Sequence, residues 1–484
     1  MNEIDKTIIE ELASRVEELG GRAYMVGGAV RDEIMKRPIK DVDIEVHGIS
    51  EAVLEAVLKE LGKPLRFGSA FGVYSLAGHQ IDIALPRSER KSGSGHRDFE
   101  IEIDPFIGIK EAARRRDFTM NALLKDILSG EIADPFGGTE DIKNRIIRHI
   151  DDEKFGEDPL RALRAAQFRS RFGFQVAPST ISICRALDLR NLSAERVEME
   201  MKKALLESRR PSEFFECLRE MGQLGYWFQE LEQLIGLEQN PKFHPEGDVW
   251  THTMMVLDRA ARFRPSASDP YAFMLLALTH DFGKITTTEF VNGAIHAYGH
   301  ELQGAEIAER FLNRVCHGSD IKKYIANMIP NHMRPNKIAE ARSSVKKTNR
   351  MFDDAIAPND LIYFAICDKP KLPHLDAHNL SQASNESHEL LDDTSRKSEL
   401  YTDDERLRER ERIQFLFDRL DLYRDMMARP YVTGKDLIDR GIMPGDDFGT
   451  ILEYAHKLRL AGVSKDDALK QTLPYARKLR KNIK

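Results

Sequence analysis

The spacing of apolar residues changes once along the chain, near residue 155, and this change limits the folds that the sequence can adopt. Before it, short apolar or alternating runs predict β-strands. These runs lie at residues 23–28, 41–46, 72–77, 80–85 and 99–104. After it, apolar residues recur every three or four positions, which predicts helices at 159–172, 194–207 and 211–222. The sequence therefore indicates a small unit of strands and helices, followed by a long all-α part.

Two polar stretches predict a loop and a linker, and the chain length predicts the number of domains. Residues 88–98 are rich in Gly, Ser and charge and lie between two predicted strands, which predicts a mobile loop. Residues 381–405 are polar and separate a helical block from a last helical segment that begins near Arg408. At about 150 residues per domain, a chain of 484 residues has room for about three domains.

The composition excludes several classes of protein. The formal net charge of −7 argues against a wholly basic protein that coats nucleic acid, although it leaves room for a local basic groove. Four scattered cysteines do not suit a disulfide framework or a CxxC zinc site. The first residues are acidic and polar, unlike a secretory signal, and the longest apolar run (272–278) is too short to span a bilayer. We expect a cytoplasmic protein with no membrane contact and no obligate protein partner.

The strongest chemical signal of the first unit lies between residues 25 and 46. A strand-like run ends on Gly27 and Gly28, which open a turn and let backbone N–H groups approach a phosphate. Asp41 and Asp43 share one face of the next strand, since they are two residues apart. Two carboxylates held together favour a bound divalent cation, most simply Mg²⁺, and Asp82 on a neighbouring strand is a weaker third candidate. A plain turn and a solvated strand end are the competing interpretation.

Basic residues further along add candidates for nucleotide binding. Arg115 and Arg116 precede a helical run and could clamp a triphosphate, with Asn121 helping to hold the site; a merely charged helix start is the alternative. Asp158 and Arg161 can share a helix face, with Arg164 one turn on. Side by side, an Asp and an Arg offer acceptors and donors that match the edge of a base. Alternatively, Asp158 is a helix N-cap followed by Pro159.

These motifs, in this order, resemble the class II tRNA nucleotidyltransferase (CCA-adding enzyme) and bacterial poly(A) polymerase family. The matching motifs are VGGAVRD with DVD, RRDFTMNAL, DPFGGTEDIKNRIIRH, GEDPLRALRAAQFRSRFGF and LSAERVEME. The resemblance implies a polymerase-β-like head with a mixed or antiparallel sheet, then an all-α neck, body and tail. It implies Mg²⁺ on the catalytic Asp41 and Asp43. It also implies nucleotide contacts from Gly28, Arg31, Arg115, Arg116, Asn121, Glu157, Asp158, Arg161 and Arg164, with CTP and ATP as substrates and no nucleic-acid template.

A second constellation of metal-ligand residue types follows on the helices. Its members are His252, His280, Asp281, His300, His332 and Asp368. Imidazole and carboxylate suit a divalent transition metal such as Ni²⁺, Mn²⁺ or Fe²⁺. A buried apolar helix that ends in His280 and Asp281 needs such a partner for its polar groups. Taken alone, each histidine is more simply interpreted as an ordinary core or surface residue. The order of all six residues along the chain favours a metal site.

The series resembles the HD phosphohydrolase superfamily, and both halves together resemble the multifunctional type of CCA-adding enzyme. The resemblance implies phosphatase and 2′,3′-cyclic phosphodiesterase activity in the body. It weakens after Asp368, where Lys-Pro-Lys replaces the Gly-Arg frequent in the family. The resemblance predicts four parts. They are a nucleotidyltransferase head (1–150), a helical neck with the nucleotide-recognition motif (151–220), an all-α HD body (221–380) and a polar linker with a helical tail (381–484).

We expect tRNA to contact local basic clusters in spite of the net negative charge. The clusters are Lys36, Arg37 and Lys40; Arg161, Arg164, Arg169 and Arg171; Arg209 and Arg210; and Arg477, Lys478, Arg480 and Lys481. Ordinary solvated faces are the alternative for each. Three hypotheses remain open for the whole chain: addition of C, C and A to tRNA with a second hydrolase activity; poly(A), CC-only or A-only addition; or a metal phosphohydrolase whose head only binds RNA.

Overall fold

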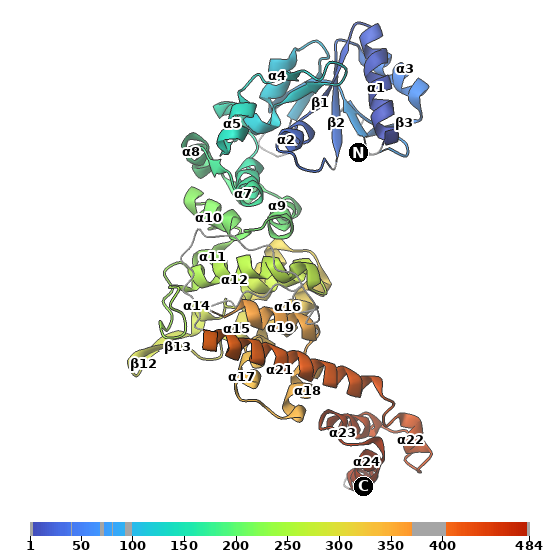
Figure 1. Cartoon of the computed structure of the whole chain (residues 1–484), viewed down its shortest axis with the longest axis vertical. Coiled ribbons are helices and arrows are strands. Elements are labelled where there is room, and N and C mark those ends of the chain that lie inside the picture. Colours follow the sequence, from blue (N-terminus) through green and yellow to red (C-terminus); the bar gives the residue numbers. More distant parts are fainter. Residues whose placement is uncertain are drawn as a thin grey trace. The chain divides into compact units, whose positions relative to one another are not determined.

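The computed structural model describes residues 3–39, 41–67, 72–79, 81–91, 99–369 and 403–481 (Figure 1). The chain forms two compact units, the first ending at Trp227 and the second beginning at Phe228. Among the described residues, no helix has the length and apolarity needed to cross a membrane.

A seven-stranded mixed sheet forms the core of the first unit. Its strands stand in the order β3-β4-β5-β2-β1-β8-β9. Their bounds are β1 Arg22–Val26, β2 Val42–His47, β3 Pro64–Phe67, β4 Val73–Leu76, β5 Ile81–Ala84, β8 Leu124–Asp126 and β9 Ile132–Ala133. Only β2 and β5 run parallel in this sheet; its other neighbours are antiparallel. The predicted α+β class with a mixed sheet in the head is confirmed.

The alternation of residues along β2 explains how this sheet presents polar side chains. Val42, Ile44 and Val46 are buried at 5%, 1% and 0% exposure. They belong to the core that α1 (Glu3–Glu18) and α3 (Glu51–Leu61) help to build. Burying such a side chain stabilises the fold by roughly 1.5–3 kcal/mol. The residues between them point to the other face of the sheet, so Asp43 is left exposed there.

Short helices lie between the strands of this unit or directly after them, and a helical layer follows. They are α2 Gly28–Ile34, α4 Ile109–Arg114, η1 Thr119–Asn121, α5 Gly138–Asn144 and α6 Asp152–Gly156. The helical layer consists of α7 Leu160–Phe172, α8 Pro178–Ala186, η2 Leu189–Asn191, α9 Ala194–Glu207 and α10 Ser212–Met221. Helix α7 packs against α9 and α10 through its buried face, and Gly173 in the left-handed region ends it. The three predicted neck helices are therefore present.

The second unit is built around an apolar helix. In α13 (Pro270–Thr279), every residue from Tyr271 to Thr279 is buried. Neighbouring helices α12 Val249–Phe263, α16 Ser319–Asn331 and α19 Pro358–Cys367 pack against it. The other helices are α11 Gln229–Glu232, η3 Arg264–Ser266, α14 Lys284–Thr287, α15 His300–Val315, α17 Arg334–Glu340, α18 Val345–Asp354, α21 Asp403–Ala428, α22 Gly434–Ile438, α23 Phe448–Leu460 and α24 Lys465–Lys481.

The structure corrects three sequence expectations about local structure. The predicted loop at 88–98 begins too early, because residues 87–91 form β6, which pairs with β7 (Phe99–Ile103); residues 92–98 lie outside the described ranges. The predicted last helix starts at Asp403, before Arg408, so part of the 381–405 stretch is helical. The all-α prediction also missed the hairpin of β12 (Thr288–Val291) and β13 (Ala294–Ala297).

That hairpin has a local cause in the sequence. Asn292 and Gly293 join its strands with φ of 51° and 80°, the left-handed values that a two-residue type I′ turn needs. The Asn-Gly pair was therefore a readable turn signal inside a helical region. A smaller parallel pair, β10 (Ile146–Ile147) with β11 (Gln175–Val176), ties the sheet-containing region to the start of α8. The four predicted domains and the three boundaries between them stay predictions.

Candidate active sites

Three carboxylates of the first unit meet at one place on the sheet. Asp43 on β2 and Asp82 on β5 are register partners across the parallel strands, and Asp41 precedes β2 directly. Although its side chain reaches solvent, neighbouring protein atoms partly desolvate the Asp43 carboxyl group and raise its pKa; Arg116 opposes this, while Asp82 and Asp41 raise the pKa further. The ionised form of Asp43 is thus disfavoured without a cation nearby. The structure brings together the three acidic residues proposed from the sequence.

Glu45 lies two residues beyond Asp43 on β2, and sequence reasoning missed it. Its Oε2 lies 3.5 Å from Arg115 Nη2 and 3.4 Å from Arg116 Nη2. Its Oε1 lies 2.9 Å from His47 Nε2. Burial alone would raise the pKa of Glu45, but the bond from His47 and the nearby arginine charges lower it to about 2. A buried anion therefore fixes the two predicted triphosphate-binding arginines beside the acidic cluster.

The glycine pair before α2 has a steric role next to these arginines. Gly27 has φ of 69°, and a Cβ at this position would lie 2.8 Å from Arg116 Nη1. Gly28 then begins α2. A side chain at Gly27 would both strain the backbone and displace a guanidinium of the site.

Arg31 and Asn121 form a buried link instead of an open phosphate clamp. Arg31 is only 5% exposed, and its Nη1 donates to Asn121 Oδ1 at 2.7 Å. Its Nε donates to Asp32 Oδ1 at 2.9 Å, and its guanidinium lies 4.7 Å from the ring centroid of Phe172. Asn121 in turn donates to Asp117 Oδ1 at 2.9 Å. The nucleotide-binding role of both residues stays a prediction. The hydrogen bonds described here fix the orientation of both side chains.

The proposed base-reading residues are present, but they are held by partners that the sequence did not reveal. Asp158 Oδ2 accepts from Arg196 Nη2 at 2.8 Å. Asp158 Oδ1 also accepts from the N–H of Leu160 at 3.1 Å, the kind of bond that a capping residue makes, although α7 begins at Leu160 with Pro159 in the N-cap position. Arg161 donates to the carbonyl oxygens of Lys154 at 2.7 Å and Arg115 at 2.6 Å. Within the described residues, no side-chain hydrogen bond joins Asp158 to Arg161, although the N–H of Arg161 donates to the carbonyl oxygen of Asp158 at 3.0 Å.

The remaining two predicted residues of this group also have acidic or basic neighbours. Arg164 Nε donates to Asp117 Oδ2 at 2.6 Å, and Arg164 Nη1 lies 3.9 Å from Glu200 Oε1. Glu157 Oε1 accepts from Lys154 Nζ at 3.2 Å. Asp117, Glu200 and Arg196 were missed, since their partners lie 36 or more positions away in the sequence and no local periodicity connects them.

Acidic residues neutralise several of the basic clusters that we expected to face tRNA. Arg169 pairs with Glu213 and Glu220, at 3.1 Å and 2.6 Å. Arg171 Nε lies 2.9 Å from Glu207 Oε2. Arg210 pairs with Glu213 at 2.8 Å and Arg480 with Asp447 at 2.7 Å, and Arg164 has the acidic partners described above. These arginines are therefore paired with carboxylates, and the expected contact of their clusters with tRNA stays a prediction; Lys40 lies outside the described residues.

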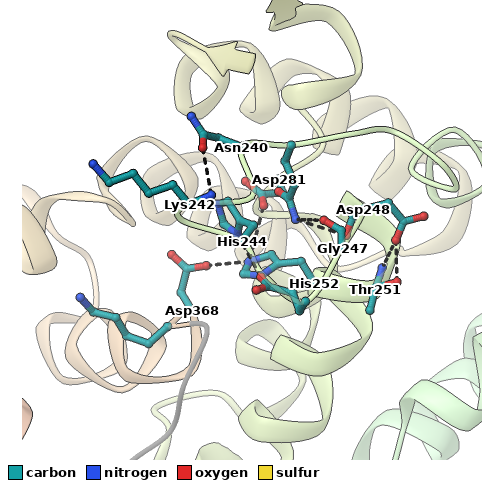
Figure 2. Close-up of polar contacts among 12 residues, drawn as sticks. Asn240, Lys242, His244, Gly247, Asp248, Thr251, His252, Asp281 and Asp368 are labelled. Atoms are coloured by element: carbon teal, nitrogen blue, oxygen red, sulfur yellow. Dashed lines mark hydrogen bonds and ion pairs between the residues drawn. The ribbon is translucent and has the colours of Figure 1, made fainter. Parts of the chain in front are cut away.

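The six predicted metal-ligand residues of the second unit converge, and five of them lie at the ends of helices. His280 and Asp281 follow α13, His300 begins α15, His332 follows α16 and Asp368 follows α19. His252 lies inside α12. Figure 2 shows His252, Asp281 and Asp368 close together. All four histidines and Asp281 are buried, with Asp281 only 2% exposed.

Asp281 divides the cluster into two ligand groups. Its Oδ2 lies 3.2 Å from His280 Nε2 and 3.7 Å from His252 Nε2. Asp368 Oδ1 completes this group, 3.1 Å from His252 Nε2 and 3.4 Å from His280 Nε2. The other oxygen, Asp281 Oδ1, lies 3.5 Å from His300 Nε2, and Asp281, His300 and His332 form the second group. One carboxylate can therefore contribute an oxygen to each of two cations.

Backbone carbonyls set the imidazole tautomers of three of these ligands. The Nδ1 atoms of His280, His300 and His332 lie 3.1, 2.8 and 2.6 Å from the carbonyl oxygens of Ala277, Ala297 and Ile329. Each Nδ1 must donate there, so Nε2 is the acceptor whenever the ring is neutral, the form that binds metal. Among the described residues, Nε2 of His300 and of His332 has no hydrogen-bond partner although both are buried. Buried imidazole nitrogens that lack a hydrogen-bond partner and face a carboxylate are suited to bind a metal cation, which would satisfy both groups.

The electrostatics of the cluster also favour a cation. Burial would lower the pKa of His280, but Asp281 and Asp368 raise it to about 10. Burial lowers the pKa of His332 to about 4, although Asp368 opposes this, so its imidazole is neutral and able to bind metal at neutral pH. Lys284 Nζ lies 2.7 Å from Asp281 Oδ2 and donates to Gln239 Oε1 at 2.9 Å. Sequence reasoning missed this buried lysine, although it follows Asp281 by one helical turn.

Gly283 allows the chain between these ligands to pack tightly. A Cβ at Gly283 would lie 1.9 Å from the carbonyl oxygen of His300, an impossible contact. The backbone of α15 thus approaches the turn after Asp281 directly. This approach carries His300 toward Asp281.

Comparisons with known proteins agree with both sites. A family model described as the poly A polymerase head domain matches residues 23–148, and one for the HD domain matches 249–422. A third, described as the probable RNA and SrmB-binding site of polymerase A, matches 173–235. These matches define a polymerase-type nucleotidyltransferase head joined to an HD domain.

Curated relatives narrow this class. A multifunctional CCA protein of Actinobacillus pleuropneumoniae is 38% identical over 326 residues, covering 66% of this chain and 77% of the relative. Those of Haemophilus ducreyi and Xanthomonas campestris are 36% and 37% identical with the same coverage. The chain belongs to the family of multifunctional CCA proteins, that is, of CCA-adding tRNA nucleotidyltransferases with an HD domain.

Solved structures agree on the fold. The CCA-adding enzyme of Thermotoga maritima, complexed with tRNA, has a TM-score of 0.63 at 19% identity, covering 98% of this chain and 96% of that one. A CCA-adding enzyme with ATP has a TM-score of 0.65 at 18% identity, covering 99% and 95%. The Bacillus stearothermophilus enzyme with CTP has a TM-score of 0.60 at 20% identity and full coverage of both chains.

Proposed function

We propose that this chain adds C, C and A from CTP and ATP to the 3′ end of tRNA without a nucleic-acid template, and that its HD domain hydrolyses phosphate esters. The observation that carries the first activity is the register pairing of Asp43 with Asp82, with Arg115 and Arg116 held beside them by Glu45. Carboxylates for a cation next to guanidinium groups for a triphosphate are the components that nucleotidyl transfer needs. Membership of the multifunctional CCA family supports the choice of tRNA as acceptor.

In the head, Asp41 and Asp43 would hold Mg²⁺, with Asp82 as a further ligand candidate. The cation would stabilise the charge that develops on the α-phosphate and the leaving pyrophosphate. Arg115 and Arg116 neutralise the triphosphate, and Glu45 keeps the two guanidiniums in place. The tRNA 3′-hydroxyl attacks the α-phosphate in line, a P–O bond forms to the tRNA, and pyrophosphate leaves.

The neck would select the base. Asp158 and Arg161 present an acceptor and donors to the edge of cytosine or adenine, with Glu157 and Arg164 beside them. Arg196 holds the Asp158 carboxylate, and the carbonyls of Lys154 and Arg115 hold the Arg161 guanidinium. The bond from Arg161 to the Arg115 carbonyl joins the base-reading region to the segment that binds triphosphate. We assign these roles to the predicted head at 1–150 and neck at 151–220.

The HD body, predicted at 221–380, would bind divalent metal through the six convergent residues described above. The donor set of imidazoles and carboxylates suits Ni²⁺, Mn²⁺ or Fe²⁺. Such a metal supplies polarisation of a phosphoryl oxygen and a more acidic bound water. The chain's own contribution is to fix the Nε2 atoms, to split the Asp281 carboxylate between two ligand groups, and to place Lys284 beside it. We infer phosphatase and 2′,3′-cyclic phosphodiesterase activities for this site.

A stepwise addition assay tests the first activity. Purified protein with Mg²⁺ is given tRNA ending at the discriminator base, at C, or at CC, with CTP, ATP or both. Full activity predicts completion of all three substrates and termination after A. Products ending at CC, addition of A only, or a long A tail would instead identify a partial enzyme or a poly(A) polymerase.

A pair of variants separates the two sites. Asp43→Ala should abolish addition and keep hydrolysis of 2′,3′-cyclic nucleotides. His280→Ala combined with Asp281→Ala should do the reverse. Retention of every activity by the Asp43→Ala protein would favour the alternative in which the head only binds RNA.

A further inference from the structure

His252 differs from the other three histidine ligands in its position on its helix. His280 and His332 follow the last turns of helices, where backbone carbonyls lack an intrahelical partner, and His300 begins α15 with its Nδ1 beside the carbonyl of Ala297 in the preceding strand. His252 lies within the first turns of α12, where the carbonyls in reach are already used by the helix itself. Its Nδ1 therefore needs an acceptor from another segment if Nε2 is to be free for metal.

Glu246 provides this acceptor. Its Oε1 lies 2.7 Å from His252 Nδ1, while His252 Nε2 faces Asp368 and Asp281 at 3.1 and 3.7 Å. The two nitrogens of an imidazole point in divergent directions, so Glu246 lies on the side of the ring away from the carboxylates of the cluster. Only the tautomer with a proton on Nδ1 satisfies a carboxylate there.

The segment before α12 holds Glu246 rigidly. The same Oε1 lies 3.0 Å from His244 Nδ1, and the ring of His244 packs edge-on against that of His252, 4.8 Å between centroids. Asp248 caps α12 by accepting from the N–H of Thr251 at 2.9 Å. Gln239 donates to the carbonyls of Gly247 and Asp248, both at 3.2 Å. Figure 2 shows this segment folded over His252.

We propose that Glu246 is a positioning residue that fixes the tautomer and ring orientation of His252, so that Nε2 is presented to the metal site. A carboxylate that accepts from the far nitrogen of a metal-binding imidazole also makes the near nitrogen a stronger ligand. This inference rests on the proposed metal-binding function of the body. It extends the site to a residue that supplies no ligand atom itself.

Metal affinity of the full chain tests the proposal without any catalytic assay. The apo protein is titrated with Mn²⁺ in competition with a chelator of known affinity, and bound metal is counted at saturation. Glu246→Ala should weaken binding about 10–100-fold, the usual loss for such a partner, with unchanged stoichiometry. Glu246→Gln should lose less, because its amide oxygen still accepts from Nδ1–H. The exposed Glu238, eight residues earlier, gives the matched control Glu238→Ala, expected to bind as the parent does.

Each other outcome is decisive. Parent-like affinity in Glu246→Ala overturns the positioning role alone. Loss of one bound metal ion in Glu246→Gln overturns it in favour of a direct ligand. If the parent binds no more Mn²⁺ than the protein with His280→Ala and Asp281→Ala, the metal-binding function of the body fails and this inference fails with it. Nucleotide addition by each variant, carried out by the other unit, shows that the protein has folded.

Discussion

Glu45 Oε2 lies 3.4 Å from Arg116 Nη2. Glu45 is on the same strand and the same sheet face as Asp43, the candidate metal ligand. The alternation of β2 thus sets a ligand for a cation and an anchor for cationic side chains two residues apart. Arg115 shares this anchor at 3.5 Å. The carboxylate of Glu45 therefore lies next to both guanidinium groups and holds each arginine in place before a triphosphate binds.

Glu45→Gln should weaken nucleotide binding more than it slows the chemical step. Without the carboxylate the two guanidiniums lose their common anchor, while Asp41 and Asp43 are untouched. We expect the KM for CTP and ATP to rise about tenfold, equivalent to roughly 1.4 kcal/mol, with a smaller change in kcat. Steady-state addition to tRNA ending in CC measures both constants. The exposed Glu17 on α1 provides the control Glu17→Gln; a fall in kcat with unchanged KM would contradict the anchoring role.

The same carboxylate should make the first unit sensitive to acid. The folded pKa of Glu45 is lowered from 4.5 to about 2, so its ionisation stabilises the fold above pH 4.5. This contribution, of the order of 3 kcal/mol, is lost as the pH falls from about 4.5 to about 2. Glu45→Gln should flatten the dependence of unfolding free energy on pH across this window. Urea unfolding at several pH values, followed by Trp227 fluorescence in a Trp250→Phe background, measures it; equal pH slopes in parent and variant would refute the prediction.

Arg196→Ala should reduce the accuracy of base selection. Arg196 donates to Asp158 Oδ2 at 2.8 Å and so limits the orientations open to that carboxylate. When it is lost, discrimination of CTP and ATP against UTP and GTP should fall about tenfold, since a hydrogen bond to a charged group contributes about 1.5–3 kcal/mol. Single-turnover incorporation of each nucleotide gives the ratio. Arg190→Ala, which removes an arginine 69% exposed in its side chain, should leave the ratio unchanged.

How far the sequence predicts this protein depends on the range of the interactions. Asp41 and Asp43 lie two residues apart at the start of β2, and four of the six predicted metal ligands follow helices, so local sequence patterns were enough to name these residues as candidates. The partners were not predictable in this way. Arg196 contacts Asp158 across 38 positions and Arg116 contacts Glu45 across 71, and only the packing of whole elements brings them together. The β12–β13 hairpin, in contrast, was predictable from a local signal, the turn sequence Asn292-Gly293. The helical periodicity on both sides of it hid this signal.

Gly283→Ala should damage the HD site and leave nucleotide addition intact. The new Cβ would overlap the His300 carbonyl, 1.9 Å away, so the start of α15 must move and carry His300 from Asp281. We expect at least a tenfold loss of cyclic phosphodiesterase activity, together with a destabilisation of about 1–3 kcal/mol from overpacking. Activity assays and Mn²⁺ titration check the first effect, and thermal unfolding the second. The matched control is Gly449→Ala within α23, where nothing lies within 4 Å of the added Cβ. There the better helix propensity of alanine should stabilise the protein by about 1 kcal/mol, so a loss of hydrolysis in both variants would contradict a specific role for Gly283.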